Sequence, residues 1–389
     1  MKSDTTTVAF TGGGTAGHIY PGLAVADELR GIFSRNGRPV RIIWIGASHG
    51  MDGKIVGSTA GAEGIPSADV FYGIPSGKLR RYFSFKNFTD IFRIAGGFFR
   101  SIYVLSKERP AALFSKGGFV SVPPCLAARI LGIPVYTHEC DFTLGLANRI
   151  NLKSAGTLFV SYQETKDSVS APGKNVVLSG NPVRPVFYSA SAERGFEFLG
   201  LPAEKRDRPV LLVLGGSSGS RQINSLVTGS LAWLCRNFIV VHQTGIVNTD
   251  PEAAAASAGK FGDSYRSYPF IYSRMADVLA CCDVVLSRAG ANSVWESAVL
   301  RKPMVLVPLS GGGTRGDQVE NAGYFKRHGA AEVLAGDDVS PEGLKAALGH
   351  LCDPSVRDRM AENLRLLTGD RKPALAIAEY IYRNLPEEK

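Results

Sequence analysis

The stretch Val8-Ala9-Phe10-Thr11-Gly12-Gly13-Gly14-Thr15-Ala16-Gly17-His18 decides the fold. A short apolar run enters a glycine loop of the pattern GxGxxG, and residues 21–33 then carry Leu23, Ala26 and Leu29 about one helical turn apart. Strand, glycine loop and helix in this order predict the first unit of a parallel, doubly wound sheet. The N–H groups of such a loop and the helix N-terminus favour an anionic ligand.

The same pattern restarts in the second half of the chain. Pro182 and Pro185 break any regular element, and Pro209–Leu214 then forms a new strand-like run that enters Gly215-Gly216-Ser217-Ser218-Gly219-Ser220. Further runs are continuously apolar, which is typical of parallel strands covered on both faces. They lie at residues 40–45, 111–114, 133–137, 157–160, 238–242, 284–287 and 304–308. We therefore expect an α/β fold with two Rossmann-like domains, residues 1–182 and 186–368, and a cleft between them.

The composition is that of a globular chain of 389 residues, with 44% apolar residues, a mean hydropathy of +0.02 and a net charge of +9. No run reaches the length of a membrane-spanning helix, and the first residues lack the apolar segment of a signal peptide. The six cysteines show no metal-type spacing, so we expect reduced and mostly buried thiols. The cations are dispersed and match no nucleic-acid-binding module, so we expect no nucleic-acid partner.

The first glycine loop admits more than one ligand. A dinucleotide site also needs an acid at the end of the second strand to hold the ribose, and here that strand ends in Gly46-Ala47-Ser48-His49, with Asp52 following late. An oxidoreductase is therefore a weaker alternative. His18 begins a helix, where the dipole lowers the pKa of an imidazole, so a neutral ring could accept a proton from an alcohol.

Polar side chains gather after the later strands of the second half. Glu296 lies about one turn into the helix that follows residues 287–290, where a carboxylate can accept two hydrogen bonds from a ribose diol. Asp317, Gln318 and Asn321 follow the glycine-rich stretch at 311–316 at helical spacing, which suits sugar hydroxyls. Because ligands of α/β sheets bind at the carboxyl ends of strands, we expect these groups to form one site.

Several motifs in fixed order give the chain a specific resemblance. They are residues 10–18, Ser115-Lys116-Gly117-Gly118-Phe119-Val120-Ser121-Val122-Pro123, His138-Glu139-Cys140-Asp141, Gly145-Leu146-Ala147-Asn148, Gly180-Asn181-Pro182-Val183-Arg184, Gly215-Gly216-Ser217, residues 287–296 and Arg315-Gly316-Asp317-Gln318. The chain resembles the MurG family, which transfers N-acetylglucosamine from UDP-N-acetylglucosamine to lipid I, giving lipid II in peptidoglycan synthesis. The resemblance implies the GT-B fold, in which the last helix returns to the first domain, so residues 370–389 would join residues 1–182.

The resemblance also implies a role for individual residues. In the second domain, Ser217 would hold the donor diphosphate with Arg184 near it, Ile271 would meet the uracil through its backbone, and Met275 would pack near the nucleotide. Glu296 would take the ribose hydroxyls, Ser293 would lie near the phosphates, and Asp317, Gln318 and Asn321 would read the sugar. On the acceptor side the implied residues are Thr15, Gly17, His18, Glu139 and Asp141.

Two segments differ from the pattern of many members. Many have two glutamines where this chain has Asp317-Gln318, and Glu-Gln-Asn where it has Glu139-Cys140-Asp141. A tyrosine that is frequent in the second glycine segment is Phe119 here, so no hydroxyl chemistry is expected at that position.

The implied reaction is an inverting single displacement. His18 is the first choice for the general base, and Glu139 or Asp141 is the alternative. No DxD pair stands at a strand end, so we expect neither a metal ion nor another cofactor. A UDP-sugar epimerase, or a transferase to another lipid acceptor on the same fold, is the runner-up, and an epimerase would release free sugar without any lipid acceptor.

A lipid-linked acceptor requires contact with the cytoplasmic face of the cell membrane. The region Ile74–Phe85 combines three cations with three aromatic residues, and it is the expected peripheral contact. The apolar residues between 88 and 105 recur at helical spacing, and we expect most of them to face the core.

Overall fold

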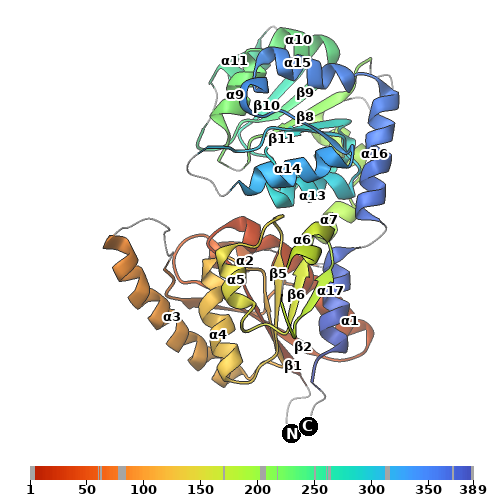
Figure 1. Cartoon of the computed structure of the whole chain (residues 1–389). Coiled ribbons are helices and arrows are strands. Elements are labelled where there is room, and N and C mark those ends of the chain that lie inside the picture. Colours follow the sequence, from red (N-terminus) through yellow and green to blue (C-terminus); the bar gives the residue numbers. More distant parts are fainter. Residues whose placement is uncertain are drawn as a thin grey trace. The chain divides into compact units, whose positions relative to one another are not determined.

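The computed structural model divides the chain into two compact units. The first unit holds Met1–Pro185 with Arg371–Lys389, and the second holds Val186–Asp370 (Figure 1). The structure describes residues 5–59, 61, 64–77, 85–169, 171–201, 207–216, 218–248, 251–259, 261, 264–311, 316–369 and 372–386.

The first unit is built on seven parallel strands in the order β3-β2-β1-β4-β5-β6-β7. The strands are β1 (Thr6–Thr11), β2 (Val40–Ala47), β3 (Val70–Ile74), β4 (Ala112–Ser115), β5 (Val135–Glu139), β6 (Thr157–Val160) and β7 (Asn175–Leu178). The helices are α1 (Tyr20–Arg35), α2 (Asp52–Ser58), α3 (Phe85–Glu108), α4 (Val122–Ile130), α5 (Leu146–Asn151), α6 (Gln163–Ser168) and α17 (Pro373–Arg383). Val8 and Phe10 pack on the side of α1 and α17, whereas Ala9 packs on the side of α3 and α4. Both faces of the sheet are therefore buried, as the continuous apolar runs predict.

The second unit repeats this design with six parallel strands in the order β10-β9-β8-β11-β12-β13. The strands are β8 (Val210–Leu214), β9 (Ile239–Gln243), β10 (Tyr265–Tyr268), β11 (Val284–Ser287), β12 (Met304–Leu306) and β13 (Ala331–Val333). The helices are α7 (Pro185–Tyr188, at the junction of the units), α8 (Ala192–Leu199), α9 (Arg221–Thr228), α10 (Leu231–Asn237), α11 (Pro251–Ala258), α12 (Met275–Cys281), α13 (Ala291–Val299), α14 (Asp317–Arg327), α15 (Pro341–His350) and α16 (Pro354–Thr368). The prediction of two Rossmann-like parallel sheets is confirmed.

The last helix, α17, packs on the first unit, as the expected fold requires. Its Tyr382 ring meets Phe33 of α1 edge to face, at 4.9 Å between centroids. Tyr380 packs against Phe159 of β6 at 5.3 Å. Ile377 and Ile381 are fully buried in the same core. Aromatic pairs of this kind contribute roughly 0.5–1.5 kcal/mol each beyond area burial, so the helix belongs firmly to the first unit.

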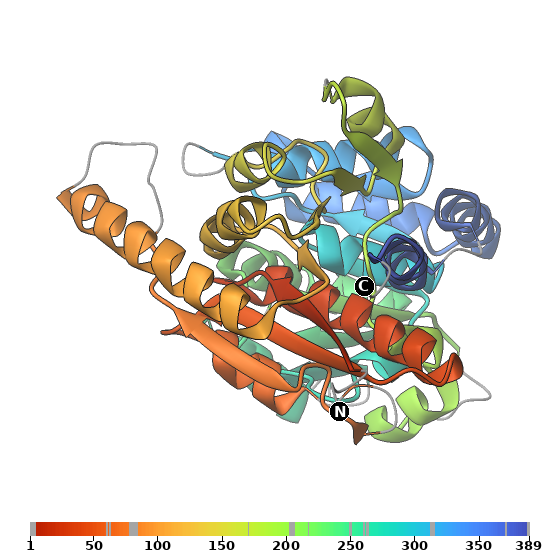
Figure 2. The same ribbon diagram turned by 90° about the horizontal axis from the view of Figure 1, so that it is seen from below.

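The expectation that residues 88–105 mostly face the core is wrong for several large side chains. Ile91, Phe92, Phe99 and Tyr103 of α3 are 55%, 64%, 70% and 56% exposed. Other residues of α3 make the contact with the rest of the unit: Val104 and Leu105 are fully buried, and a Cβ atom added at Gly97 would lie 2.3 Å from the carbonyl oxygen of Pro75. Figure 2 shows that the first part of α3 extends outward beyond the sheet. None of the described helices is long and apolar enough to cross a membrane.

Asp27 of α1 carries a pH dependence of stability. Burial raises the pKa of its carboxyl from 3.8 to about 6, against the opposing hydrogen bond from Ser67. A raised pKa in the folded state means that this group favours folding fully below pH 4 and loses that contribution as the pH rises through 6. We expect Asp27→Asn to raise the free energy of unfolding by about 2 kcal/mol at pH 8 and to change it little at pH 4. Urea unfolding at both pH values measures this, and an equal change at both would contradict it.

Candidate functional site

Three loops of the first unit meet at one edge of its sheet. They follow β1, β4 and β5, which are neighbours in the sheet, so residues 12–18, 116–121 and 140–145 lie together. The His18 ring lies against the second of these loops, because a Cβ atom at Gly118 would stand 2.8 Å from its Cδ2 atom. Gly118 has a φ of +79°, a conformation that favours glycine. The structure thus brings together the two glycine segments that the sequence singled out.

The first glycine loop is closed by a carboxylate of its own chain. The Gly14 N–H donates to both oxygens of Asp52, at 3.0 and 3.2 Å, and Asp52 is 1% exposed. The Trp44 indole N–H donates to the carbonyl of Gly12 at 3.1 Å. Sequence reasoning weighed Asp52 only as a ribose ligand and missed this contact. The Gly14 N–H that the pattern offered to an anion is therefore already used.

Glu139 organises the loop after β5. Its Oε1 atom accepts the N–H groups of Cys140 and Asp141 at 2.9 and 3.1 Å. Its Oε2 atom accepts the Gly145 N–H at 2.9 Å and the Asn148 side-chain amide at 3.0 Å. Burial, with a smaller effect of Asp141, raises the pKa of this carboxyl, and the N–H donors oppose the rise. Four donors on two oxygens make Glu139 a group that shapes the loop, and Asp141 is half-buried beside it.

The side chains of Glu139, Cys140 and Asp141 come close enough to be considered as metal ligands, with their donor atoms within 4.8 Å of one another. The chemistry of the set does not fit a cation. Both Glu139 oxygens are already hydrogen-bonded, and burial raises the pKa of the Cys140 thiol to about 12. The buried ammonium of Lys116 lies beside the same thiol and would repel a cation.

Thr15, Gly17 and Arg184 are further residues that the sequence predicted at the site. Thr15 precedes the short 3-10 turn Ala16–His18, which contains Gly17, and its carbonyl accepts the His18 N–H at 3.1 Å. The guanidinium of Arg184 lies 4.9 Å from the centre of the Tyr20 ring, at the start of α1. The structure therefore gives Arg184 a cation–π partner in the first unit.

The second unit presents a glycine loop between β8 and α9. Gly216 and Gly219 have φ values of +85° and +83°, and a Cβ atom at Gly219 would stand 2.1 Å from the carbonyl oxygen of Thr244. The Asn248 side chain donates to the carbonyl of Gly219 at 3.0 Å and so holds the loop from outside. Ser217, the residue expected to hold the diphosphate, lies outside the described residues.

Arg288 is a cation beside this loop that sequence reasoning quoted but left without a role. It stands between β11 and α13 and donates to Ser220 Oγ at 2.8 Å, to Gln222 Oε1 at 2.8 Å and to the Val307 carbonyl at 3.0 Å. Burial lowers the pKa of this guanidinium. No ion pair of Arg288 with an acid occurs among the described residues. A half-buried positive charge therefore stands at the end of the glycine loop.

The expected sugar and ribose residues gather at the next two loops. Ser293 and Glu296 lie one turn apart on α13, and both are half-buried. The side-chain amide of Asn321 on α14 donates to the Ala289 carbonyl at 3.3 Å, which ties the two helix starts together. Gln318 accepts the Leu309 N–H at 2.9 Å, and Asp317 is the first residue of α14. The strands β11 and β12 are neighbours, so these side chains share one edge of the sheet.

Ile271 and Met275 lie at the side of this edge. Ile271 is buried, and its N–H donates to Gln243 Oε1 at 2.9 Å. A uracil that accepted a hydrogen bond from this N–H would have to displace the Gln243 side chain. Met275 begins α12 and is half-buried.

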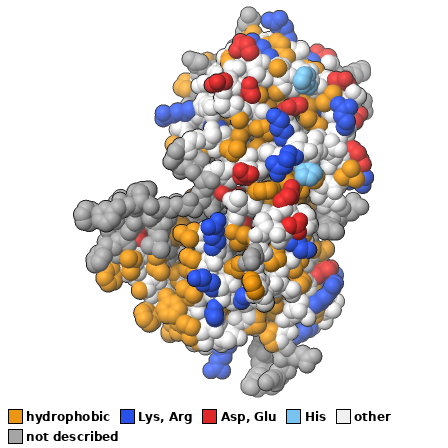
Figure 3. Space-filling model, viewed as in Figure 1, with side chains coloured by type: hydrophobic (Ala, Val, Ile, Leu, Met, Phe, Trp, Pro, Cys, Tyr) orange, Lys and Arg blue, Asp and Glu red, His pale blue; other side chains and the backbone are white. Residues whose placement is uncertain are grey.

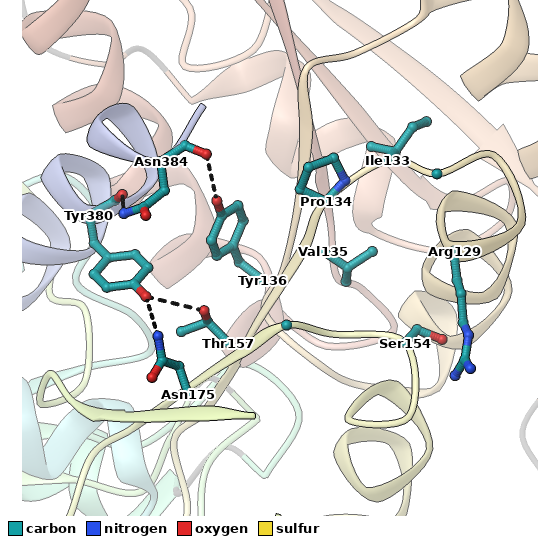
Figure 4. A pocket seen from close by; sticks show the side chains of 12 residues that line it. Arg129, Ile133, Pro134, Val135, Tyr136, Ser154, Thr157, Asn175, Tyr380 and Asn384 are labelled. Atoms are coloured by element: carbon teal, nitrogen blue, oxygen red, sulfur yellow. Dashed lines mark hydrogen bonds between the residues drawn. The ribbon is translucent and has the colours of Figure 1, made fainter. Parts of the chain in front are cut away.

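A cavity of about 440 Å³ lies at the opposite edge of the first sheet (Figure 4). Its walls include Val135, Thr157 and Asn175, which begin β5, β6 and β7, and Tyr380 of α17. The Tyr380 hydroxyl accepts the Asn175 amide at 2.9 Å. The glycine loops follow the other ends of parallel strands, so this cavity is not part of the candidate site.

Comparison with known proteins identifies the family. The model of the glycosyltransferase family 28 N-terminal domain matches residues 8–160, and that of the C-terminal domain matches residues 210–372. A relative from Treponema denticola is 50% identical over 386 residues, 96% of each chain, and is named UDP-N-acetylglucosamine--N-acetylmuramyl-(pentapeptide) pyrophosphoryl-undecaprenol N-acetylglucosamine transferase. A relative from Geobacillus kaustophilus with the same name is 38% identical over 92% of this chain and 93% of its own.

Solved structures agree on the fold. MurG from Acinetobacter baumannii superposes with a TM-score of 0.72 at 24% identity, over 97% of this chain and 99% of its own. A UDP-GlcNAc 2-epimerase from Neisseria meningitidis reaches a TM-score of 0.65 at 16% identity, over 98% of this chain and 100% of its own. At these identities the likeness shows a shared architecture, which transferases and epimerases have in common.

Proposed function

The chain belongs to glycosyltransferase family 28, and we propose that it transfers N-acetylglucosamine from UDP-N-acetylglucosamine to the C4 hydroxyl of lipid I, giving lipid II. The observation that carries this proposal is the 50% identity over 96% of the chain to a relative named for that donor and that lipid-linked acceptor. The epimerase alternative rests on the fold alone, at 16% identity.

The chemistry is an inverting displacement at the anomeric carbon. The acceptor oxygen forms the new C–O bond, the bond from that carbon to the diphosphate breaks, and UDP leaves with the electron pair. His18 takes the hydroxyl proton. We favour His18 over Glu139 because four N–H donors already occupy the two Glu139 oxygens. Asp141 stays the alternative base.

The second unit holds the donor. Glu296 accepts the ribose hydroxyls, and Asp317, Gln318 and Asn321 bind the sugar. Ile271 meets the uracil through its backbone, and Met275 packs near the nucleotide. The loop at residues 215–220 holds the diphosphate with Ser293 and Arg288. Fixed N–H groups and a half-buried guanidinium stabilise the charge that develops on the leaving group, which is the largest catalytic effect in many enzymes. No step of this reaction needs a metal ion or another cofactor.

A transfer assay tests this proposal. The chain is incubated with radiolabelled UDP-N-acetylglucosamine and a lipid I analogue, and the label in the butanol phase is counted. We expect label in the butanol phase only when the lipid acceptor is present. Conversion of UDP-N-acetylglucosamine to its C2 epimer, or release of the free epimer with water as the co-reactant, without any lipid would instead identify an epimerase. A change in nicotinamide absorbance would identify an oxidoreductase.

We further propose that the chain binds the cytoplasmic face of the membrane through α3 and α4, which pack against each other. Figure 3 shows hydrophobic side chains gathered on this part of the first unit. The exposed apolar residues are Ile91, Phe92, Phe99 and Tyr103 of α3, and Leu126, Ile130 and Leu131 at α4. Arg93, Arg100 and Arg129 are exposed on the same helices and attract anionic lipid.

This surface revises the expected contact at Ile74–Phe85. Ile74 is fully buried and cannot touch lipid, and residues 78–84 lie outside the described residues. The apolar residues of α3 and α4 take over that role in the proposal.

Negative charges introduced at exposed apolar positions of α3 should weaken membrane binding. We expect Ile91→Glu combined with Phe99→Glu to lower partition onto phosphatidylglycerol vesicles about tenfold or more, because both apolar side chains are lost from the lipid contact. Co-sedimentation measures this. Leu366→Glu is the matched control, since Leu366 is 66% exposed on the second unit. Equal partition of all three proteins would remove α3 from the membrane contact.

A further inference from the structure

The Asp52 carboxylate is a buried acid that is hydrogen-bonded directly to the first glycine loop. Its Oδ2 atom also accepts the Ala47 N–H, at 2.8 Å, so one side chain joins the end of β2 to the loop after β1. We propose that Asp52 is a positioning residue that holds the segment Gly14–His18 in its reactive shape. The proposal rests on the role of His18 as the general base.

The loop is shaped to receive this carboxylate. A Cβ atom at Gly13 would lie 1.9 Å from Asp52 Oδ2, so only glycine leaves room for the acid at that position. Gly14 has a φ of +80°, and on its other side a Cβ atom would stand 2.4 Å from the Phe119 ring. The loop is therefore fixed at Gly14 from two directions, by a hydrogen-bonded acid and by an aromatic ring.

The hydrogen bond of Asp52 to Gly14 affects His18 because the segment between these two residues is short and hydrogen-bonded to itself. Only three residues separate Gly14 from His18, and the 3-10 turn Ala16–His18 fills most of that span. The His18 carbonyl oxygen lies 2.4 Å from where a Cβ atom of Gly12 would stand, so the end of the segment packs against the chain just before its start. A displacement of Gly14 would move the imidazole, and an error of about 1 Å in a catalytic group costs roughly 10²-fold in rate.

The same contact changes what the glycine loop does. Its pattern is typical of a phosphate cradle, yet the Gly14 N–H points at an internal carboxylate. The Gly14 amide therefore helps to hold His18 in place and does not bind an anion. An anionic group of the acceptor would need hydrogen-bond donors from other residues.

The test compares two variants with a matched control. We expect Asp52→Ala to lower kcat for transfer about 10²-fold with an unchanged KM for UDP-N-acetylglucosamine, because the donor site lies in the other unit. We expect Asp52→Asn, which keeps one acceptor oxygen, to lose less. Asp69→Asn is the control: Asp69 accepts the Ile42 N–H at 2.6 Å at the other end of β2, and its loss should leave kcat unchanged. If Asp52→Ala fails to fold by circular dichroism, Asp52→Asn alone decides.

A double-mutant cycle with His18→Ala separates positioning from stability. If Asp52 acts through His18, Asp52→Ala costs less than threefold in the His18→Ala background. Equal losses in both backgrounds, or a kcat of the Asp52 variants within twofold of the parent, would overturn the proposal. Normal turnover of His18→Ala would instead refute the base assignment itself, so the two failures are distinguishable.

Discussion

Replacing His18 by alanine is expected to lower kcat by about 10²–10⁴-fold while the Kd for UDP-N-acetylglucosamine stays unchanged. The reason is that His18 lies in the first unit against Gly118, whereas the proposed donor residues lie in the second. Steady-state transfer kinetics and calorimetric titration of the donor measure the two quantities separately.

The matched control for this variant is His49→Ala. His49 is exposed and follows β2 in the same unit, and no part of the reaction involves it. Near-normal turnover of His18→Ala would transfer the base role to Asp141. If His49→Ala lowered kcat as much as His18→Ala does, the loss at His18 would reflect a general effect on folding and not a role as the base.

The second large effect is expected at Glu296. Glu296→Ala should raise the Kd for UDP-N-acetylglucosamine about 10²-fold or more, because two hydrogen bonds from a ribose to a carboxylate contribute roughly 1.5–3 kcal/mol each. The variant should also bind the 2′-deoxyribose analogue of the donor about as well as the ribose form, whereas the parent prefers ribose.

Glu320→Ala is the control for Glu296. Glu320 is an exposed acid in the first turn of α14 in the same unit. If the Glu296→Ala variant kept the parent's preference for ribose over 2′-deoxyribose, another residue would bind the ribose hydroxyls.

The fold was predictable because its signals are local. The apolar runs within β1 and β8 enter glycine loops, and both became parallel strands buried on both faces. The motif that begins at Ser287 likewise sits where a helix starts after a strand. Periodicity and glycine spacing contain this information within a dozen residues.

The missed features depend on contacts between distant parts of the chain. Asp52 and Gly14 are 38 positions apart, and Arg288 and Ser220 are 68 apart, so no spacing rule connects them. The large apolar residues of α3 misled the prediction for a related reason. Helical spacing shows which residues share a face, but it does not show that the face with Gly97, Val104 and Leu105 makes the contact.

The central claim is that the second unit holds the uridine-linked sugar and the first supplies the base. A crystal soaked with UDP-N-acetylglucosamine tests it most directly. We expect density for the ribose at Glu296 and for the diphosphate at the glycine loop that begins at Gly215. Density for the nucleotide at Gly12–Gly14 of the first unit would contradict the assignment.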